Sequence, residues 1–425
     1  MICALGTQGD LNPMIGLALE LKSRGHHVCM AAPNTYEDKL RYLKIDWVDI
    51  KPSRADIEKH PDWASIIVDP KKGVKNMLKQ FVMPFVRHNY QTLLSQVNDF
   101  DVFINHSASY AVPPLMEKFN KKWASIVLYP SLFFSSYDPP IVAQFPNINK
   151  LWQILPQPAV RFLIDLMKKR VFKWASPILD LRKELQLSLD KNPIFEGQFS
   201  PYLNISLFSN VFARRQPDWP VKNHSVGFPL HDKESLQEHL PDTPAVSFLK
   251  KSLNPKLIFT LGSMAVHDAA DFFKIAVQVR KKIDATVLLI VGRGTNNVDA
   301  LADMANDENI LIADYEIYSA VFPLASVVIH QGGIGTVSQA MAAGVPQLIV
   351  PFMSDQFDNA YRIEKMHLGL RVLKSDMTLE YMCLALEQIL QDPRYLQKAK
   401  SVQNQISKET GLKTAADLLE HLAQS

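Results

Sequence analysis

Two short stretches of this 425-residue chain contain residue types that could perform chemistry. The first, LGTQGDLNP at 5–13, is a glycine turn that holds the carboxylate of Asp10. The second, HQGGIGT at 330–336, places three glycines and a hydroxyl directly after His330. A glycine turn that opens a helix can bind phosphate through backbone N–H groups and the positive helix N-terminus. A carboxylate is out of place in such a site, so the two stretches predict different roles.

Short apolar runs separated by helical patterns must position these residues. In the N-terminal half they are expected as strands at 1–5, 26–32, 46–50, 101–106 and 124–130. In the C-terminal half they are expected at 256–263, 286–292, 309–315, 326–330 and 346–351. Strands that alternate with helices form βαβ units and parallel sheets. The sequence therefore predicts an α/β protein with two Rossmann-like, parallel-sheet domains, whose ligands lie beyond the carboxyl ends of the strands.

The boundary between the two halves follows from a lapse in this pattern. The segment 214–232 holds three prolines and has no helical period, which is typical of a linker. We expect an N-terminal domain at 1–213, a linker at 214–240, a C-terminal domain at 241–405 and a final helix at 406–425. That helix is expected to pack back on the N-terminal domain.

Bulk properties favour a cytoplasmic globular protein. The formal net charge is +3, and 47% of the residues are hydrophobic, so nothing points to a nucleic-acid partner. Cys3, Cys29 and Cys383 lie far apart and are expected as reduced thiols. No run of 18 uncharged apolar residues occurs, and no basic segment precedes the first strand. We therefore expect neither a membrane-spanning helix nor a signal peptide.

The second stretch suits a sugar diphosphate. The glycines alone would also fit a tight turn without a ligand. However, His330 ends a strand and can donate a ring N–H to the same anion, and Thr336 adds a hydroxyl donor. Asp355 and Gln356 follow the next strand, and adjacent carboxylate and amide side chains suit sugar hydroxyls. The combination predicts a site for both halves of a sugar nucleotide.

The run HQGGIGTVSQAMAAGVPQLIVPFMSDQFDNA resembles the donor-binding signature of the family 1 glycosyltransferases of the GT-B fold. The likeness extends over nearly the whole chain, from GTQGDLNP onward. Within that group, this run and the linker QPDWP…GFPL look most similar to the bacterial rhamnosyltransferase component of rhamnolipid synthesis. Sterol and natural-product aglycone glycosyltransferases are wider relatives. The resemblance implies a GT-B protein whose N-terminal domain binds the acceptor and whose C-terminal domain binds the sugar nucleotide.

Donor contacts are implied by the same resemblance. Ser263, in TLGS, would add a phosphate donor, and the segment YEIY at 315–318 stands where relatives hold the base, although it lacks their proline. Ser338 occupies the position of a ribose-binding Glu in plant-type members. The expected donor-binding residues are Gly9, Ser263, Tyr315, Ile317, His330, Gly332, Gly333, Gly335, Thr336, Asp355 and Gln356.

Asp10 is expected to be the catalytic base, because many relatives carry a His base in this turn and one branch carries Asp. Transfer with inversion needs a base within reach of the acceptor hydroxyl. The alternative is that Asp10 merely caps a helix beginning at Pro13, a task for which Asn12 is better placed. An aspartate pKa near 4 makes a weak base, so desolvation on domain closure is expected. His106 is expected to pack, cap or touch the acceptor, and Asp10 to act without a relay.

The acceptor side is expected to be apolar. Phe133, Phe134 and Tyr137, in an aromatic loop, are candidates for its wall. The segment 156–177 is a basic amphipathic helix that either packs on the acceptor side or contacts an anionic membrane surface from the cytoplasm; both hold if the acceptor is a lipid. The pair at Asp99 and Asp101 precedes a strand, so it is interpreted as surface charge.

These observations predict a metal-independent, inverting glycosyltransferase without a cofactor. The donor is a UDP- or dTDP-sugar, and the acceptor is a hydrophobic hydroxyl compound. The sharper version transfers rhamnose from dTDP-rhamnose to a hydroxy-fatty acyl lipid, and the alternative transfers glucose from UDP-glucose to a sterol or polyketide. Two further readings stay open: a non-catalytic nucleotide-sugar-binding subunit and a sugar-nucleotide epimerase. The sequence does not indicate the oligomeric state.

Overall fold

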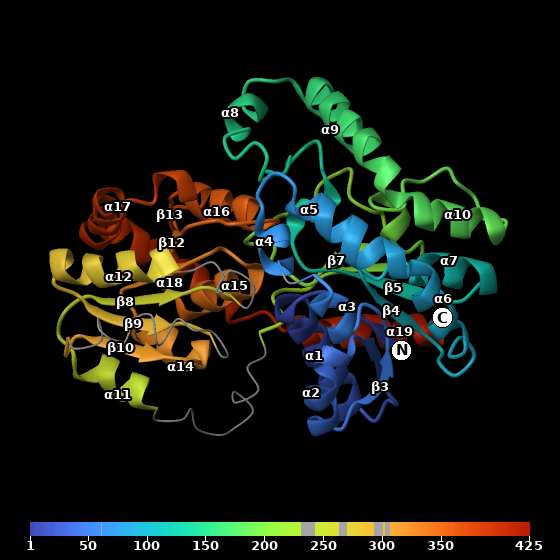
Figure 1. The fold of residues 1–425 in the computed structure, drawn as a ribbon, viewed down its shortest axis with the longest axis horizontal. Helices are drawn as coiled ribbons and strands as arrows, with labels where there is room; N and C mark the ends of the chain where they lie inside the picture. The colour runs from blue at the N-terminus through green and yellow to red at the C-terminus, as the bar shows by residue number, and fades with distance from the viewer. Residues whose placement is uncertain (61, 231–242, 263–269, 293–300, 302–306) are drawn as a thin grey trace. The chain divides into compact units, whose positions relative to one another are not determined.

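The computed structural model divides the chain into two compact units, drawn in Figure 1. Unit 1 comprises 1–141, 145–229 and 409–425, and unit 2 comprises 142–144 and 230–408. The structure describes residues 1–60, 62–230, 243–262, 270–292, 301 and 307–425.

Unit 1 is built on a seven-stranded parallel sheet in the order β3-β2-β1-β4-β5-β6-β7. Most of its strands are buried along their whole length, as expected for a parallel sheet covered on both faces. The strands are β1 (Ile2–Cys3), β2 (Cys29–Ala32), β3 (Asp46–Asp49), β4 (Phe103–His106), β5 (Trp123–Val127), β6 (Leu203–Ser206) and β7 (Asn223–Ser225).

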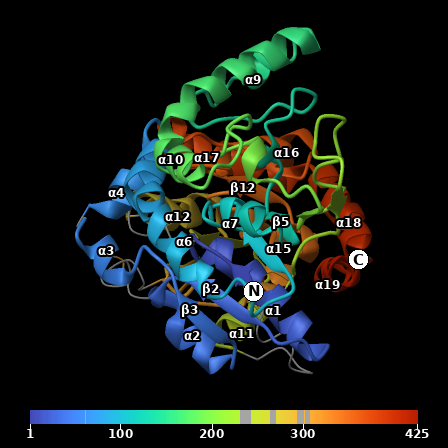
Figure 2. The same cartoon turned by 90° about the vertical axis from the view of Figure 1, so that its right-hand side faces the viewer.

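Helices cover both faces of this sheet. One face packs against α6, α7 and α10, and the other against α1 and α19. The helices are α1 (Gln8–Ser23), α2 (Glu37–Tyr42), α3 (Arg54–Glu58), α4 (Trp63–Val68), α5 (Gly73–Asn76), α6 (Val86–Leu94), α7 (Val112–Phe119), α8 (Asn149–Trp152), α9 (Gln157–Phe172), α10 (Ser176–Glu184) and α19 (Gly411–Gln424). In both views α9 lies at the outer edge of the unit, away from the sheet (Figure 2).

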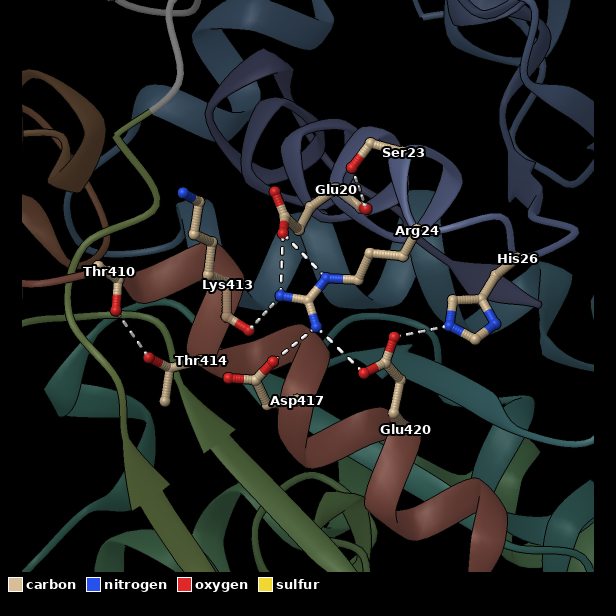
Figure 3. Close-up of polar contacts among 9 residues, drawn as sticks. All are labelled: Glu20, Ser23, Arg24, His26, Thr410, Lys413, Thr414, Asp417 and Glu420. Carbon is tan, nitrogen blue, oxygen red and sulfur yellow. Dashed lines mark hydrogen bonds and ion pairs between the residues drawn. The ribbon is translucent and has the colours of Figure 1, made fainter.

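The C-terminal helix α19 is held against α1 by apolar and polar contacts. Leu419 and Leu422 are buried in the same cluster as Leu11 and Leu17 of α1. At the rim, Arg24 just beyond α1 donates to Asp417 and Glu420 and to the carbonyl of Lys413, as Figure 3 shows. The final segment of the chain thus belongs structurally to the first unit.

Unit 2 is built on a six-stranded parallel sheet in the order β10-β9-β8-β11-β12-β13. Its strands are β8 (Lys256–Thr260), β9 (Thr286–Ile290), β10 (Ile310–Ala313), β11 (Val327–His330), β12 (Gln347–Ile349) and β13 (Gly369–Arg371). Its helices are α11 (Pro244–Lys251), α12 (Ala270–Ile283), α14 (Tyr318–Val321), α15 (Ile334–Ala343), α16 (Gln356–Lys365), α17 (Leu379–Gln391) and α18 (Pro393–Ile406).

Three strands lie outside the runs that the sequence predicts. β6 and β13 are short, and β7, with the polar sequence NHS, lies inside the segment interpreted as a linker. β7 is an edge strand that pairs only with β6 in the described structure. Edge strands contribute little apolar surface, so hydrophobic periodicity does not reveal them.

The strand order places the two stretches of interest at equivalent points. In unit 1 the order reverses between β1 and β4, and in unit 2 it reverses between β8 and β11. Crevices at such switch points, beyond the carboxyl ends of the strands, are where open α/β sheets bind ligands. Asp10 follows β1 and His106 ends β4; Gly262 follows β8 and His330 ends β11. In the described residues, no helix is both long and apolar enough to cross a membrane.

Candidate functional site

The side chain of Asp10 is fixed by the first turn of α1. This helix begins at Gln8, not at Pro13 as the sequence analysis expects, with Thr7 at the N-cap. The backbone N–H and the hydroxyl of Thr7 donate to Asp10 Oδ2 over 2.8 and 3.0 Å. Asp10 is therefore the third residue of a capping box. A Cβ on Gly6 would lie 2.4 Å from the same oxygen, so a glycine there makes room for the carboxylate.

His106 is the partner of Asp10 that the sequence analysis does not find. Its Nε2 lies 3.5 Å from Asp10 Oδ1, and the ring is 2% exposed. Its Nδ1 accepts from the backbone N–H of Ala108 over 3.4 Å, which assigns the ring proton to Nε2. In the described structure this Nε2 has no hydrogen-bond partner, so its approach to Asp10 is an electrostatic contact. The expectation that Asp10 acts alone is thus corrected: a buried imidazole faces its second oxygen.

The contacts of Asp10 set its protonation state. Burial acts to raise the pKa of this carboxyl, but the contact with His106 and the hydrogen bonds from Thr7 outweigh burial and hold the pKa below its usual value. Asp10 is therefore ionised at neutral pH. One oxygen is held by Thr7, and the other faces His106.

In unit 2 the glycine turn forms the start of α15. Gly332 has φ +90°, and a Cβ there would lie 2.7 Å from the Ile349 side chain. Gly333 is the N-cap of α15, and no side chain caps the helix. The first N–H groups of the helix therefore lack side-chain acceptors, the condition for an anion site. Gly335 has open space where a Cβ would be, and Thr336 lies in the same first turn.

His330 is fully buried and holds this turn through a hydrogen bond to Gly332. Its Nδ1 accepts from the Gly332 N–H over 3.0 Å, and its Nε2 lies 2.9 Å from Gln347 Oε1. Burial lowers the pKa of His330 to about 4, against the opposite effect of Gln347. The imidazole is thus neutral at pH 7, with the proton on Nε2. Donation to a diphosphate, as the sequence analysis expects, would require that proton to leave Gln347; in this structure His330 positions the turn.

Asn359 connects the glycine turn to the predicted sugar-binding residues. Its amide N–H donates to the Gly332 carbonyl over 2.9 Å and to Asp355 Oδ2 over 2.7 Å. Gln356 Oε1 accepts from the backbone N–H groups of Phe352 and Met353, so this oxygen shapes the loop after β12. Asp355 and the turn therefore form one hydrogen-bonded unit. Asn359 lies in the DQFDNA motif. Its spacing of four residues from Asp355 is the one sequence signal that could have indicated their hydrogen bond.

The remaining expected donor residues differ in accessibility. Tyr315 is half-exposed, whereas Ile317 is buried against α14 and α11. Ile317 could therefore contact the nucleobase of the donor only through its main chain. Gly9 is exposed in the first turn of α1. Ser263 lies outside the described residues.

Two of the three residues expected to form the acceptor wall pack against other aromatic rings of unit 1. The Phe133 ring is buried and stacks on Trp219 at 4.2 Å between centroids. Phe134 packs edge-on against Phe195, and only Tyr137 is an exposed large hydrophobic. Phe133 and Phe134 thus pack beneath the loop, because a Pro-rich segment still has to bury its apolar surface.

Asp218, which the sequence does not single out, holds the aromatic loop at Ser135 and Ser136 in place. Its carboxylate accepts from the hydroxyls of Ser135 and Ser136 and from the Ser136 N–H, over 2.6 to 3.0 Å. Asp218 lies in the segment that the sequence analysis treats as a linker. Within the described part of the chain, no cluster of three His, Cys, Asp or Glu side chains could hold a metal ion.

Known proteins resemble the chain in both halves. Residues 1–96 match the model of the glycosyltransferase family 28 N-terminal domain. Residues 277–421 match that of the erythromycin biosynthesis protein CIII-like C-terminal domain. The sterol 3-beta-glucosyltransferase of Candida albicans is 25% identical over 98% of this chain, which spans 27% of that relative's length. The O-mycaminosyltylonolide 6-deoxyallosyltransferase of Streptomyces fradiae is 23% identical, with 100% and 97% of the two chains covered.

A solved structure shares the complete fold. The glycosyltransferase VinC, in complex with dTDP, superposes with a TM-score of 0.67 at 16% identity, covering 100% of this chain and 98% of that one. Two parallel-sheet Rossmann-like units and two glycosyltransferase domain models in one chain define the class. These matches support a family 1 glycosyltransferase, and the two parallel-sheet units have the GT-B fold.

Proposed function

We propose that this protein transfers a sugar, with inversion, from a UDP- or dTDP-sugar to a hydroxyl of a hydrophobic acceptor. Asp10 accepts the hydroxyl proton, and the first turn of α15 binds the diphosphate. The observation that carries the proposal is the Asp10 carboxylate itself. It is oriented on one oxygen by Thr7, faces buried His106 with the other, and is ionised at neutral pH.

The chemistry follows from these contacts. As the acceptor oxygen attacks the anomeric carbon, its proton passes to Asp10 Oδ1, and the bond to the diphosphate breaks on the opposite side of the sugar. The buried His106 ring, whose Nε2 lies 3.5 Å from Oδ1, faces the carboxylate and favours its charged form. The departing diphosphate is stabilised by the N–H groups and positive end of α15. Asp355, tied to this turn through Asn359, is suited to hold sugar hydroxyls.

The identities of the donor and the acceptor are proposed in two versions. In the more specific version, the donor is dTDP-rhamnose and the acceptor is a hydroxy-fatty acyl lipid. The alternative is UDP-glucose and a sterol or polyketide. The name of the Candida albicans relative supports glucose and a sterol, and that of the Streptomyces fradiae relative supports a natural-product acceptor. A matrix of UDP- and dTDP-sugars against lipid, sterol and macrolide acceptors distinguishes the two. Product from a GDP-sugar alone would contradict both versions.

The decisive variant is Asp10→Asn, and the chain offers a matched control. Asp56 occupies the same third position of a capping box, behind Ser53, at the start of α3. If Asp10 is the base, Asp10→Asn lowers the transfer rate by about 10²–10⁴-fold and leaves the nucleotide-induced thermal shift unchanged. Asp56→Asn removes the same kind of cap and keeps transfer. Equal effects of the two variants would reduce Asp10 to a helix cap.

The same assays separate the two other readings of the sequence. A non-catalytic subunit would bind the nucleotide but form no product alone, and Asp10→Asn would not change the activity of the partner that it serves. An epimerase would convert the sugar nucleotide without an acceptor. Product that requires acceptor, donor and Asp10 together contradicts both.

A further inference from the structure

The segment 145–166, which includes α8 and the first part of α9, carries an unusual set of exposed apolar side chains. Ile154 is 76% exposed, Phe162 68%, Phe145 59% and Leu166 55%. Phe162 and Leu166 stand one turn apart on α9, and the other two lie on the segment that leads into it. Single exposed apolar residues need no explanation, but a group of large ones on one projecting segment indicates an interaction surface.

This surface is not the apolar face that the sequence predicts. The helical spacing of the 156–177 segment predicts an apolar face that includes Val160, Val171 and Trp174. In the structure Val160 is buried, and Val171 and Trp174 pack against the core of unit 1. That face therefore serves the fold. Phe162 and Leu166 lie on the opposite side, and both views place α9 at the outer edge of unit 1 (Figure 2).

Basic side chains continue the exposed row. Residues 145–175 contain six Lys or Arg and one acidic residue, Asp165. Lys168 pairs with Glu196 over 2.7 Å. Lys169, seven residues beyond Phe162, lies on the same side of α9, and Lys173 follows directly after the end of that helix; both are exposed. We call Phe145, Ile154, Phe162, Leu166, Lys169 and Lys173 the outer face.

We propose that the outer face docks unit 1 on the surface of a bilayer that contains anionic lipids. A helix that presents aromatic and aliphatic side chains beside a row of lysines is the pattern that lies in a membrane interface. The apolar side chains enter the acyl boundary, and the lysines remain at the level of the headgroups. The inference goes beyond sugar transfer and does not require it.

Charge favours this occupant over a second copy of the chain. A symmetric dimer through the outer face would place the same basic row of both copies together. Like charges brought together in a desolvated interface oppose association. An anionic bilayer instead complements both the apolar and the basic part of the outer face.

Flotation of the full-length protein with vesicles tests the proposal. Vesicles of equal parts phosphatidylcholine and phosphatidylglycerol should bind the protein, and vesicles of phosphatidylcholine alone should bind it at least tenfold more weakly. The double variants F162S/L166S and K169E/K173E should each lose at least tenfold of the binding. All these side chains are exposed, so unchanged thermal unfolding verifies the fold.

Two controls match the chemistry of these variants elsewhere on the chain. Leu253→Ser removes a fully exposed apolar side chain in unit 2, and K281E/K282E reverses an exposed basic pair on α12. Both should bind like the wild type. The proposal is overturned if the wild type binds neither vesicle, if the controls lose as much as the outer-face variants, or if F162S/L166S instead abolishes a dimer seen by sizing. Because no donor is present, failure here leaves the proposed transferase activity untouched.

Discussion

At the scale of single residues, His106 should control how basic Asp10 is. Burial raises the pKa of Asp10, and the contact with His106 helps to lower it. His106→Ala removes that contact and keeps most of the burial, so the pKa of Asp10 should rise. Only the ionised carboxylate accepts a proton, so activity falls as the pH drops through this pKa. The acid limb of the kcat/KM profile should therefore move to higher pH.

His106→Gln is the conservative rescue for that experiment, because it restores an N–H donor at nearly the same reach. It should return the acid limb toward its wild-type position, while His106→Ala also loses about tenfold of kcat through poor orientation of the carboxylate. If both variants lower kcat without moving the acid limb, His106 merely fills space. Asp10 would then be positioned by Thr7 alone.

Gly332 offers a second residue-scale prediction. Its φ of +90° and the 2.7 Å approach of a Cβ to Ile349 make any side chain strained. Gly332→Ala should cost about 1–3 kcal/mol of unfolding free energy and abolish nucleotide binding. Gly335→Ala, with open space at its Cβ, should retain the melting temperature. Thermal unfolding with and without UDP or dTDP measures both effects; equal melting temperatures of the two variants would contradict the strain.

Residue types were more predictable than their partners. The glycine turn and the DQFDNA motif are visible in the sequence because their spacing is local. The approach of His106 to Asp10 joins residues 96 positions apart on β4 and α1, and no local pattern encodes it. The start of α1 was misplaced because Pro13 is typical of a first helical turn. Thr7 and Asp10 cap the helix earlier, and Pro13 is accommodated inside it.

At the scale of elements, the contact between α1 and α19 combines two kinds of stabilisation of different size. Arg24 bonds to Glu20, Asp417 and Glu420 at a partly exposed rim, whereas Leu419 is buried. Leu419→Ala should cost about 2–5 kcal/mol. Arg24→Met should cost only about 1–2 kcal/mol, and high salt should diminish the Arg24 effect alone. Denaturant unfolding in low and high salt gives both values; a salt-independent loss for Arg24→Met would mean that its packing dominates.

The contact with α19 also holds the helix that carries Asp10. Asp10 stands in the first turn of α1, and the buried side of that helix is covered by α19.

Most strands and this helix could be predicted from the pattern of hydrophobic residues, because buried parallel strands are continuous apolar runs. β7 and β13 could not, since they are edge strands with few buried residues, and in β6 the polar residues Asn204 and Ser206 interrupt the apolar run. Asp218 was missed for a related reason: a proline-rich segment gives no signal of the loop that it anchors.

At the scale of the whole molecule, the two units should respond to different ligands. The proposed diphosphate contacts all lie in unit 2, around β11 and the first turn of α15, whereas Asp10 lies in unit 1. Saturating UDP or dTDP stabilises whatever binds it, by about 2.7 kcal/mol at one hundred times Kd. Hydrogen exchange of the full-length chain should therefore slow at 330–343 and 352–359 with the nucleotide. The Gly332→Ala variant should show no slowing in these segments.

The same hydrogen-exchange measurement on Asp10→Asn separates nucleotide binding from sugar transfer. That substitution lies outside unit 2, so the nucleotide should protect the same segments as in the wild type even though transfer is lost. Protection around Thr7 and His106 should appear only when an acceptor is added. If the nucleotide instead protects the first turn of α1 and leaves α15 unchanged, the roles of the two glycine turns are reversed. Asp10 would then border a phosphate site, the one arrangement that its ionised state makes unfavourable.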